Sequence, residues 1–137
     1  MNQVFSNLWI GDANDGRDAN ALRSHNIKIV VNETNETDSL GGQFEYVRLN
    51  QQDGQPILKS TLLLFLTSLC GMRMAHPEGG ILIHCGAGVS RASSFTIAWL
   101  MFCGMSWQAA EFAIRCVRPQ IQPHPELKKS VLEFFSA

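Results

Sequence analysis

Apolar residues in this chain form two kinds of segment, short runs and longer periodic stretches. The short runs predict strands over 4–5, 8–10, 27–31, 44–49 and 81–83. The runs over 27–31 and 81–83 are rich in β-branched residues, whereas 44–49 alternates between apolar and polar residues. The longer stretches predict helices over 17–25, 58–74, 93–104, 107–117 and 127–135. Because strands and helices alternate along the chain, we expect an α/β fold that binds its ligand at the carboxyl ends of the strands.

Capping residues and prolines set several of the expected helix boundaries. Pro56 precedes the second helix, Gly104 ends the third, and Ser106 is placed to cap the fourth. In the helix over 107–117, helical periodicity predicts that one face is buried. That face carries Ala109, Phe112, Ala113, Cys116 and Val117.

Composition narrows the class of protein. The 137 residues are 45% hydrophobic, which allows one domain with a substantial core but not two. The net charge of −1 comes from 11 basic and 12 acidic residues spread along the chain. We therefore expect neither a nucleic-acid partner nor a membrane partner. The chain shows no secretory signal and no apolar stretch that could span a bilayer, so a cytoplasmic location is expected.

Residues 79–104 form the central segment of the chain. A β-branched run before His84 predicts a strand, and the apolar stretch from Ser93 predicts a buried helix. The loop between them consists of small residues that separate one cysteine from one arginine: Cys85, Gly86, Ala87, Gly88, Val89, Ser90 and Arg91. Small residues before a helix N-terminus can turn their backbone N–H groups inward and form an anion cradle.

Cys85 and Arg91 give this cradle its chemistry. The planar guanidinium of Arg91 matches two oxygens of a phosphate, so the loop is suited to a phosphoryl group. The helix N-terminus and the arginine are expected to lower the pKa of the Cys85 thiol. A thiolate there would be a nucleophile directed at phosphorus. The alternative for a cysteine after a strand is an inert buried thiol.

Asp53 is the candidate general acid. It is the only carboxylate between Glu45 and Glu78, and it precedes Cys85 by 32 positions. Expulsion of a serine or tyrosine oxygen from phosphorus is costly without a proton, so the chemistry needs such a group. The alternative role for Asp53 is a turn with Gly54, which an Asp-Gly pair favours in any protein.

The pattern His84-Cys85-(five residues)-Arg91 resembles the HCX5R motif of the cysteine-dependent protein phosphatases. Residues 87–91 resemble the dual-specificity branch, and residues 7–12, 46–49 and 118–123 extend the similarity over nearly the whole chain. The resemblance implies a single catalytic domain over 1–137. Its expected fold is a central mixed, mostly parallel sheet of about five strands, flanked by helices on both faces, as in the protein tyrosine phosphatases.

The resemblance also implies a mechanism and a set of roles. Cys85 attacks phosphorus, Arg91 and the loop N–H groups hold the phosphate, and Asp53 protonates the leaving oxygen. His84 would order the loop through hydrogen bonds and help keep the thiol ionised. The implied protein is a monomer without metal or cofactor, and its partner is a phosphorylated protein or peptide.

One position departs from the family pattern. The residue after the arginine is usually serine or threonine, whose hydroxyl eases the departure of sulfur from phosphorus, but here it is Ala92. Ser93 lies about 100° further around the helix and is a doubtful substitute. We therefore expect slow breakdown of the phosphoenzyme.

The loop also bears on the substrate and on rival functions. Relatives that favour phosphoinositides carry lysines in this loop, whereas residues 86–90 are uncharged. This favours phosphotyrosine and also phosphoserine or phosphothreonine in proteins. One alternative is a weakly catalytic phosphate-binding module. A second is a sulfur-transfer or redox protein with a reactive thiolate, which would not need Asp53.

Overall fold

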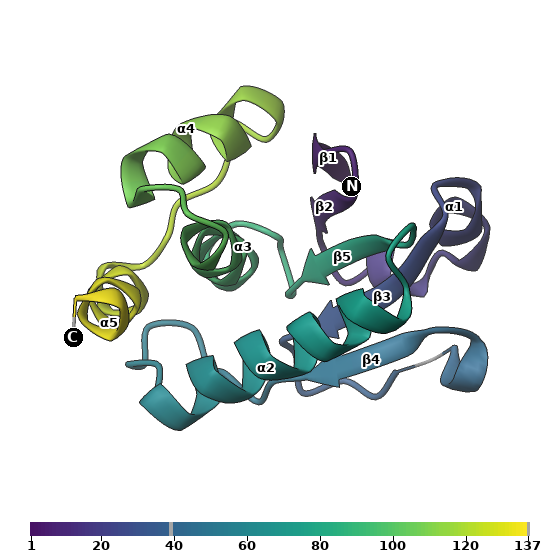
Figure 1. The fold of residues 1–137 in the computed structure, drawn as a ribbon, viewed down its shortest axis with the longest axis horizontal. Coiled ribbons are helices and arrows are strands. Elements are labelled where there is room, and N and C mark those ends of the chain that lie inside the picture. The colour runs from purple at the N-terminus through teal and green to yellow at the C-terminus, as the bar shows by residue number, and fades with distance from the viewer. Residues whose placement is uncertain (39, 137) are drawn as a thin grey trace.

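The computed structural model describes residues 1–38 and 40–136, which form a five-stranded sheet with helices on both faces (Figure 1). The strands are β1 (Asn2–Phe5), β2 (Leu8–Gly11), β3 (Ile27–Asn32), β4 (Glu45–Arg48) and β5 (Gly80–His84). The helices are α1 (Ala19–Ser24), α2 (Lys59–Ala75), α3 (Arg91–Phe102), α4 (Trp107–Val117) and α5 (Pro125–Phe135). Two short 3₁₀ turns, Asp15–Arg17 and Gly41–Gln43, lie in the connections.

The sheet has the strand order β1-β2-β5-β3-β4. Only β1 and β2 are antiparallel, and the other neighbours are parallel. The expected mixed, mostly parallel sheet of about five strands is therefore confirmed. The strand β5 is central and buried throughout, which explains why it is a continuous apolar run rather than an alternating one. Its neighbour β3 is buried except at Lys28.

The two faces of the sheet bury different amounts of apolar surface. Helices α2 to α5 contribute to a large core on one face, where Ile29, Val31 and Ile83 point. A much smaller core on the other face holds Val30 and Leu82 under α1. Side chains alternate between the faces along each strand, so neighbours in sequence enter different environments.

Helix α3 is the central helix of the larger core. Nine of its 12 residues are buried, and Phe95 packs edge-on against Phe65 of α2 with ring centroids 5.1 Å apart. A helix that is apolar on most sides is typical of such a buried position. Its first turn lies directly after the loop at the end of β5, so the larger core fixes the position of that loop.

The buried face predicted for α4 is wrong. The helix buries Trp107, Ala110 and Ile114, and Phe112 is 71% exposed. The sequence of α4 carries two apolar stripes, and the helix packs against α3 and β1 through the stripe that includes the large Trp107 side chain. Packing against neighbouring elements, which local periodicity does not contain, selects between the stripes.

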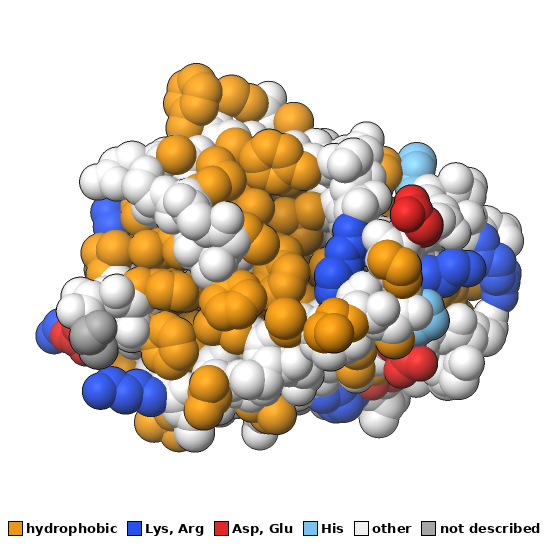
Figure 2. All heavy atoms as spheres, in the orientation of Figure 1, with side chains coloured by type: hydrophobic (Ala, Val, Ile, Leu, Met, Phe, Trp, Pro, Cys, Tyr) orange, Lys and Arg blue, Asp and Glu red, His pale blue; other side chains and the backbone are white. Residues whose placement is uncertain are grey.

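Apolar side chains also reach the surface over the helices. Figure 2 shows a broad apolar area over the side occupied by α2 to α5, with charged side chains gathered mainly toward the side of α1. Large exposed apolar side chains on the helices include Leu63, Leu64, Met74, Phe102, Phe112 and Leu132. Across residues 1–38 and 40–136, no helix has the length and apolar character needed to cross a membrane.

Candidate active site

The loop from Cys85 to Arg91 joins β5 to α3, and the protein binds its carbonyl groups from outside. Gly86 O accepts a hydrogen bond from Ala13 N at 3.1 Å, and Val89 O accepts one from Gln122 N at 2.9 Å. Ser90 O accepts from Ser94 N at 2.9 Å. Since each peptide group points its N–H opposite to its C=O, these bonds turn the loop N–H groups toward the interior of the loop.

Arg118 binds the two remaining carbonyls at the tip of the loop. Its Nε donates to Gly88 O at 2.8 Å and its Nη2 donates to Ala87 O at 3.3 Å, while Nη1 donates to Asn2 Oδ1 at 2.7 Å. This arginine is only 6% exposed. It is a structural element of the loop whose role the sequence prediction missed.

Gly88 has to be glycine at this point. Its φ is +70°, and a Cβ atom built on it would lie 2.5 Å from Gly11 O and 2.6 Å from Arg118 Nη2. Any side chain would therefore displace the backbone of β2 or the arginine that holds the loop.

Two of the inward N–H groups contact the cysteine. Gly88 N and Ala92 N each lie 3.3 Å from Cys85 Sγ and donate toward it. The N–H groups of Gly86, Ala87, Val89, Ser90 and Arg91 donate to no residue within the described part of the chain. Oriented, unpaired N–H groups around a concave loop are typical of anion-binding sites.

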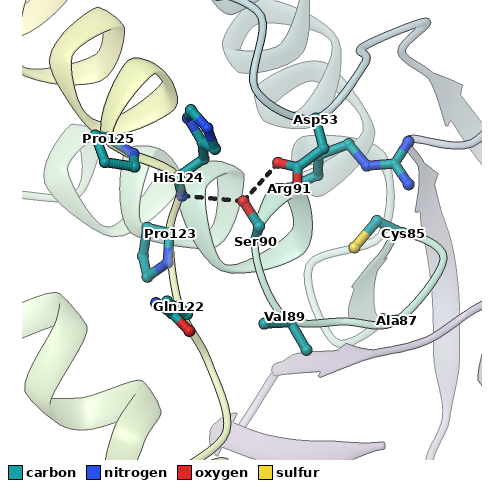
Figure 3. Close-up of a pocket in the computed structure, with 10 residues that line it drawn as sticks. All are labelled: Asp53, Cys85, Ala87, Val89, Ser90, Arg91, Gln122, Pro123, His124 and Pro125. Atoms are coloured by element: carbon teal, nitrogen blue, oxygen red, sulfur yellow. Dashed lines mark hydrogen bonds between the residues drawn. The ribbon is translucent and has the colours of Figure 1, made fainter.

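Arg91 extends its guanidinium beside Cys85 (Figure 3). One terminal nitrogen, Nη1, donates to Glu33 O at 2.9 Å and to Gln51 O at 3.1 Å. These two carbonyls fix the plane of the guanidinium, and no described residue accepts a hydrogen bond from its Nε or Nη2. The arrangement suits a planar donor pair for two oxygens of a bound anion.

Asp53 lies at the same cleft, held by the loop itself. Ser90 Oγ donates to Asp53 Oδ1 at 2.6 Å, and His124 N donates to Ser90 Oγ at 3.0 Å (Figure 3). The structure thus brings together the three side chains that the sequence singled out, Cys85, Arg91 and Asp53. The Ser90 hydroxyl, which the sequence prediction did not use, positions the carboxylate.

The cleft has a volume of about 420 Å³, and its far wall comes from the segment before α5. Its lining residues are Asp53, Cys85, Ala87, Val89, Ser90, Arg91, Gln122, Pro123, His124 and Pro125. His124 has two roles here. It caps α5, since its Nδ1 accepts from Glu126 N at 3.1 Å, and it also lines the cleft.

The pKa of the Cys85 thiol differs from the sequence-based prediction. Burial raises its pKa, and the neighbouring Glu33 carboxyl raises it further, whereas the N–H groups of Ala92 and Gly88 and the Arg91 guanidinium lower it. The net shift of the pKa is upward, so the predicted lowering is not found. The sequence argument counted the helix N-terminus and the arginine, but it omitted a sulfur that is 3% exposed and the carboxyl beside it.

His84 lies on the opposite face of the sheet from Cys85. Its imidazole approaches Gly16, and its buried Nδ1 has no hydrogen-bond partner within residues 1–38 and 40–136. Burial lowers the pKa of this imidazole. Its backbone carbonyl joins the two strand ends, because His84 O accepts from Glu33 N at 3.1 Å.

The position after Arg91 also bears on the chemistry. Ala92 is fully buried and offers only its backbone N–H to the sulfur. The Ser93 hydroxyl points away from the sulfur and donates to Val89 O at 2.7 Å and to Ser90 O at 2.9 Å. Ser93 therefore does not replace the missing hydroxyl.

The fold and the site together define a protein of the cysteine-dependent phosphatase class. The family profile described as "Dual specificity phosphatase, catalytic domain" matches residues 8–137. This chain belongs to the dual-specificity phosphatase family.

Curated relatives agree with this assignment. Dual specificity protein phosphatase 15 of Rattus norvegicus is 30% identical over 139 residues, covering 98% of this chain and 57% of the relative. Dual specificity protein phosphatase 22-B of Danio rerio is 26% identical over 136 residues, covering 98% of this chain and 73% of the relative. The chain thus spans only a little over half the length of the rat protein that it matches.

Solved structures share the fold. The human tyrosine phosphatase-like serine/threonine/tyrosine-interacting protein superimposes with a TM-score of 0.87 at 21% identity, covering 99% of this chain and 95% of that one. The crystal structure of DUSP15 superimposes with a TM-score of 0.85 at 24% identity, covering 96% and 85% of the two chains.

Proposed function

We propose that this protein hydrolyses phosphate monoesters on tyrosine, and also on serine and threonine, in phosphorylated proteins. One observation carries the proposal. The Cys85 sulfur lies at a loop whose N–H groups point inward, with the Arg91 guanidinium and the Asp53 carboxylate in the same cleft.

In the first step, the Cys85 thiolate attacks phosphorus in line with the leaving oxygen. A bond forms between sulfur and phosphorus as the bond from phosphorus to the ester oxygen breaks. The N–H groups of residues 86–91 and the free donors of Arg91 stabilise the charge on the three equatorial oxygens. Holding Arg91 on two backbone carbonyls beforehand reduces the reorganisation that this stabilisation requires.

Asp53 supplies the proton that the leaving oxygen needs. Its Oδ1 accepts a hydrogen bond from the Ser90 hydroxyl, so in our proposal Oδ2 carries the proton that is transferred. After the leaving group departs, the ionised carboxylate takes a proton from an attacking water. The bond between phosphorus and sulfur then breaks, which releases phosphate and regenerates the thiolate.

This second displacement is the slow step in our proposal. Departing sulfur carries negative charge, and in this site only the two N–H groups of Gly88 and Ala92 donate to it. A hydroxyl at position 92 would add a third donor. The missing donor predicts that the cysteinyl-phosphate accumulates during turnover.

The walls of the cleft favour a peptide substrate. Val89, Pro123 and Pro125 are apolar lining residues, and the loop itself carries no lysine. An apolar, weakly charged rim suits a phosphorylated side chain and its flanking peptide better than a highly charged inositol phosphate.

The test is a stopped-flow assay of para-nitrophenyl phosphate hydrolysis by wild type, Cys85→Ser and Asp53→Asn. We expect a nitrophenol burst followed by slow turnover in wild type. Cys85→Ser should show neither phase, and Asp53→Asn should slow the burst by about 10²–10⁴-fold. A Cys85→Ser protein with substantial activity would refute the assignment of the nucleophile.

A phosphate-binding module without useful turnover is the second candidate, which the methyl side chain of Ala92 and the raised pKa of the Cys85 thiol favour. Such a protein would bind phosphopeptides and release no phosphate. Calorimetry with a phosphotyrosine peptide, run beside the burst assay, separates the two candidates.

A further inference from the structure

Glu33 lies beside the nucleophile on the neighbouring strand. The register of β3 and β5 pairs Asn32 with His84, so the next residues, Glu33 and Cys85, come together at the strand ends. The bond from Glu33 N to His84 O, at 3.1 Å, continues this pairing. Side chains alternate along a strand, so Glu33 and Cys85 both point to the face covered by α3.

The Glu33 carboxyl is buried without a hydrogen-bond partner. The residue is 0% exposed, and neither Oε1 nor Oε2 accepts or donates a hydrogen bond to any described residue. A buried carboxylate loses its hydrogen bonds to water, and here no described residue supplies others. This favours the protonated form of the carboxyl group. Burial accordingly raises the pKa of Glu33 well above its usual range, and only the Arg91 guanidinium opposes the shift.

Few other charged groups act on this pair. From α3, Arg91 acts on both side chains. The residue that follows β4 next to this pair is the apolar Leu49, a member of the larger core. His84, Asp38 and Arg48 belong to the opposite face of the strand ends, where Asp38 acts on His84 and approaches Arg48. One cation therefore faces two acidic groups that neighbour each other in a dry environment.

We propose that Glu33 and Cys85 share one proton, so that the Glu33 carboxyl sets how much of the nucleophile is present as thiolate. Two neighbouring acids in a dry site resist carrying two negative charges, as carboxylate pairs do. A single guanidinium balances one charge. The pair thus holds one proton and one negative charge through the neutral range.

The one proton can reside on either group without changing their total charge, and it is exchanged through solvent because no hydrogen bond joins the two side chains among the described residues. In one form the sulfur is a thiol and Glu33 is ionised. In the other, the S–H bond has broken, an O–H bond has formed on Glu33, and the sulfur is a thiolate. The N–H groups of Gly88 and Ala92 stabilise the thiolate, whereas no group donates to the carboxylate.

The catalytic meaning of this exchange rests on the proposed phosphatase function. When the thiolate attacks phosphorus, Glu33 keeps the proton and presents a neutral side chain beneath the phosphorylated sulfur. When sulfur departs in the second step, the thiolate is restored beside the neutral Glu33 side chain. Glu33 acts through Cys85 and is therefore a positioning residue rather than one that contacts substrate.

The test measures the thiol itself. Rates of alkylation of Cys85 by iodoacetamide are followed from pH 5 to pH 10 by mass spectrometry of its peptide, with the exposed Cys116 as an internal reference. Wild type is compared with Glu33→Gln and with Glu33→Leu, both of which remove the shared charge. Glu78→Gln is the matched control, because it makes the same chemical change at an exposed turn.

We expect both neutral variants to move the Cys85 profile to lower pH by about one unit or more, which is a tenfold or greater increase in alkylation rate below the midpoint. Glu78→Gln and the Cys116 profile should not move. Coincident profiles for wild type and Glu33→Gln would overturn the proposal. A shift in Glu33→Leu alone would overturn it too, because that result would follow from side-chain shape rather than charge.

Failure of this proposal and failure of the phosphatase proposal are distinguishable. Alkylation requires no turnover, so the shared proton can be found in a protein that releases no phosphate. Conversely, an unchanged alkylation profile together with a normal nitrophenol burst would leave the phosphatase proposal intact and remove only the role of Glu33.

Discussion

Adjacent residues at the end of β3 enter two different chemical environments. The Asn32 side chain donates to Glu36 O at 3.1 Å and to Asp38 Oδ1 at 2.8 Å, and its Oδ1 accepts from Thr34 N and from Thr34 Oγ1. Glu33, one residue further on the opposite face, has no hydrogen-bond partner for its carboxyl among residues 1–38 and 40–136.

The difference separates two uses of a buried polar group. A side chain whose hydrogen bonds are all made has a fixed protonation state and fixes its neighbours, so it builds structure. A buried side chain with unmade bonds is costly to the fold and remains responsive to protons and charge. We call the face with Asn32 the structural face, and the face with Glu33 and Cys85 the reactive face. His84 lies on the same face as Asn32, but its buried Nδ1 has no hydrogen-bond partner in the part of the chain that the structure describes, so this imidazole remains responsive to protons.

The largest effect expected on the reactive face follows from Arg91→Lys. Lysine cannot offer the planar donor pair, so we expect kcat/KM for a phosphotyrosine peptide to fall about 10²–10³-fold. The matched control is Arg48→Lys, since Arg48 also donates through Nη1 to a backbone carbonyl, Glu36 O, but on the structural face. If kcat/KM falls equally in Arg91→Lys and Arg48→Lys, the two faces do not differ in their importance for activity.

The largest effect on the structural face is a loss of stability. Asn32→Ala removes four side-chain hydrogen bonds and leaves partners unsatisfied, so we expect the free energy of unfolding to fall by about 2–3 kcal/mol. Urea denaturation measures this. Thr34→Ala, which removes only part of the network, should cost less. The alkylation profile of Cys85 should stay unchanged in Asn32→Ala, and a shifted profile would contradict the division between faces.

The two faces should also differ in the sign of their pH dependence. The pKa of Glu33 is raised in the folded state, so the folded chain keeps a proton that the unfolded chain has already released. The contribution of Glu33 to the free energy of unfolding therefore falls as the pH rises from the usual glutamate pKa toward the raised pKa of the folded state. The pKa of His84 is lowered, so stability from it falls as pH drops below the usual histidine range, near 6.5.

Unfolding free energies of wild type, Glu33→Gln and His84→Asn between pH 4 and pH 8 test these signs. Each group contributes a slope of at most about 1.4 kcal/mol per pH unit. Relative to wild type, Glu33→Gln should gain stability as pH rises, and His84→Asn should gain stability as pH falls. The prediction fails if both differences have the same sign.

The smallest effect concerns the departing sulfur. Ala92→Ser adds one donor, worth about 0.5–1.5 kcal/mol, so breakdown of the phosphoenzyme should accelerate roughly two- to tenfold. Rapid mixing resolves this second phase. Ser93→Ala is the control, because its hydroxyl is bound to Val89 O and Ser90 O and should leave the phase unchanged. If Ala92→Ser does not accelerate this phase, the missing hydroxyl at position 92 is not the cause of slow turnover.

Local patterns predicted most of the fold and the contiguous part of the site. The short apolar runs and the alternating run over 44–49 located every strand that the structure describes. The loop from Cys85 to Arg91 was found because its residues are consecutive in sequence. Asp53 was identifiable because no other carboxylate competes with it between Glu45 and Glu78. In α4, by contrast, periodicity offered two apolar stripes and could not choose between them.

Residues whose importance comes from tertiary neighbours were missed. Arg118 and His124 reach the loop from segments more than 25 positions away. Arg118 begins the stretch 118–123 that extends the family similarity, but nothing local in the sequence shows that it binds the loop. Glu33 did leave a signal, because it continues the phase of Ile29 and Val31 toward the buried face of the larger core. The raised pKa of Cys85 follows first from the burial of the thiol and then from the Glu33 carboxyl, and both depend on tertiary packing.

The bond from Arg118 to Asn2 joins residues 116 positions apart, and the same guanidinium holds the tip of the loop. Contacts of such long sequence separation are formed against a large loss of chain entropy and tend to appear late in folding. During folding, the sheet and α3 can therefore assemble before the tip of the loop is fixed. A newly folding molecule would first acquire a stable core and only afterwards the ability to bind phosphate.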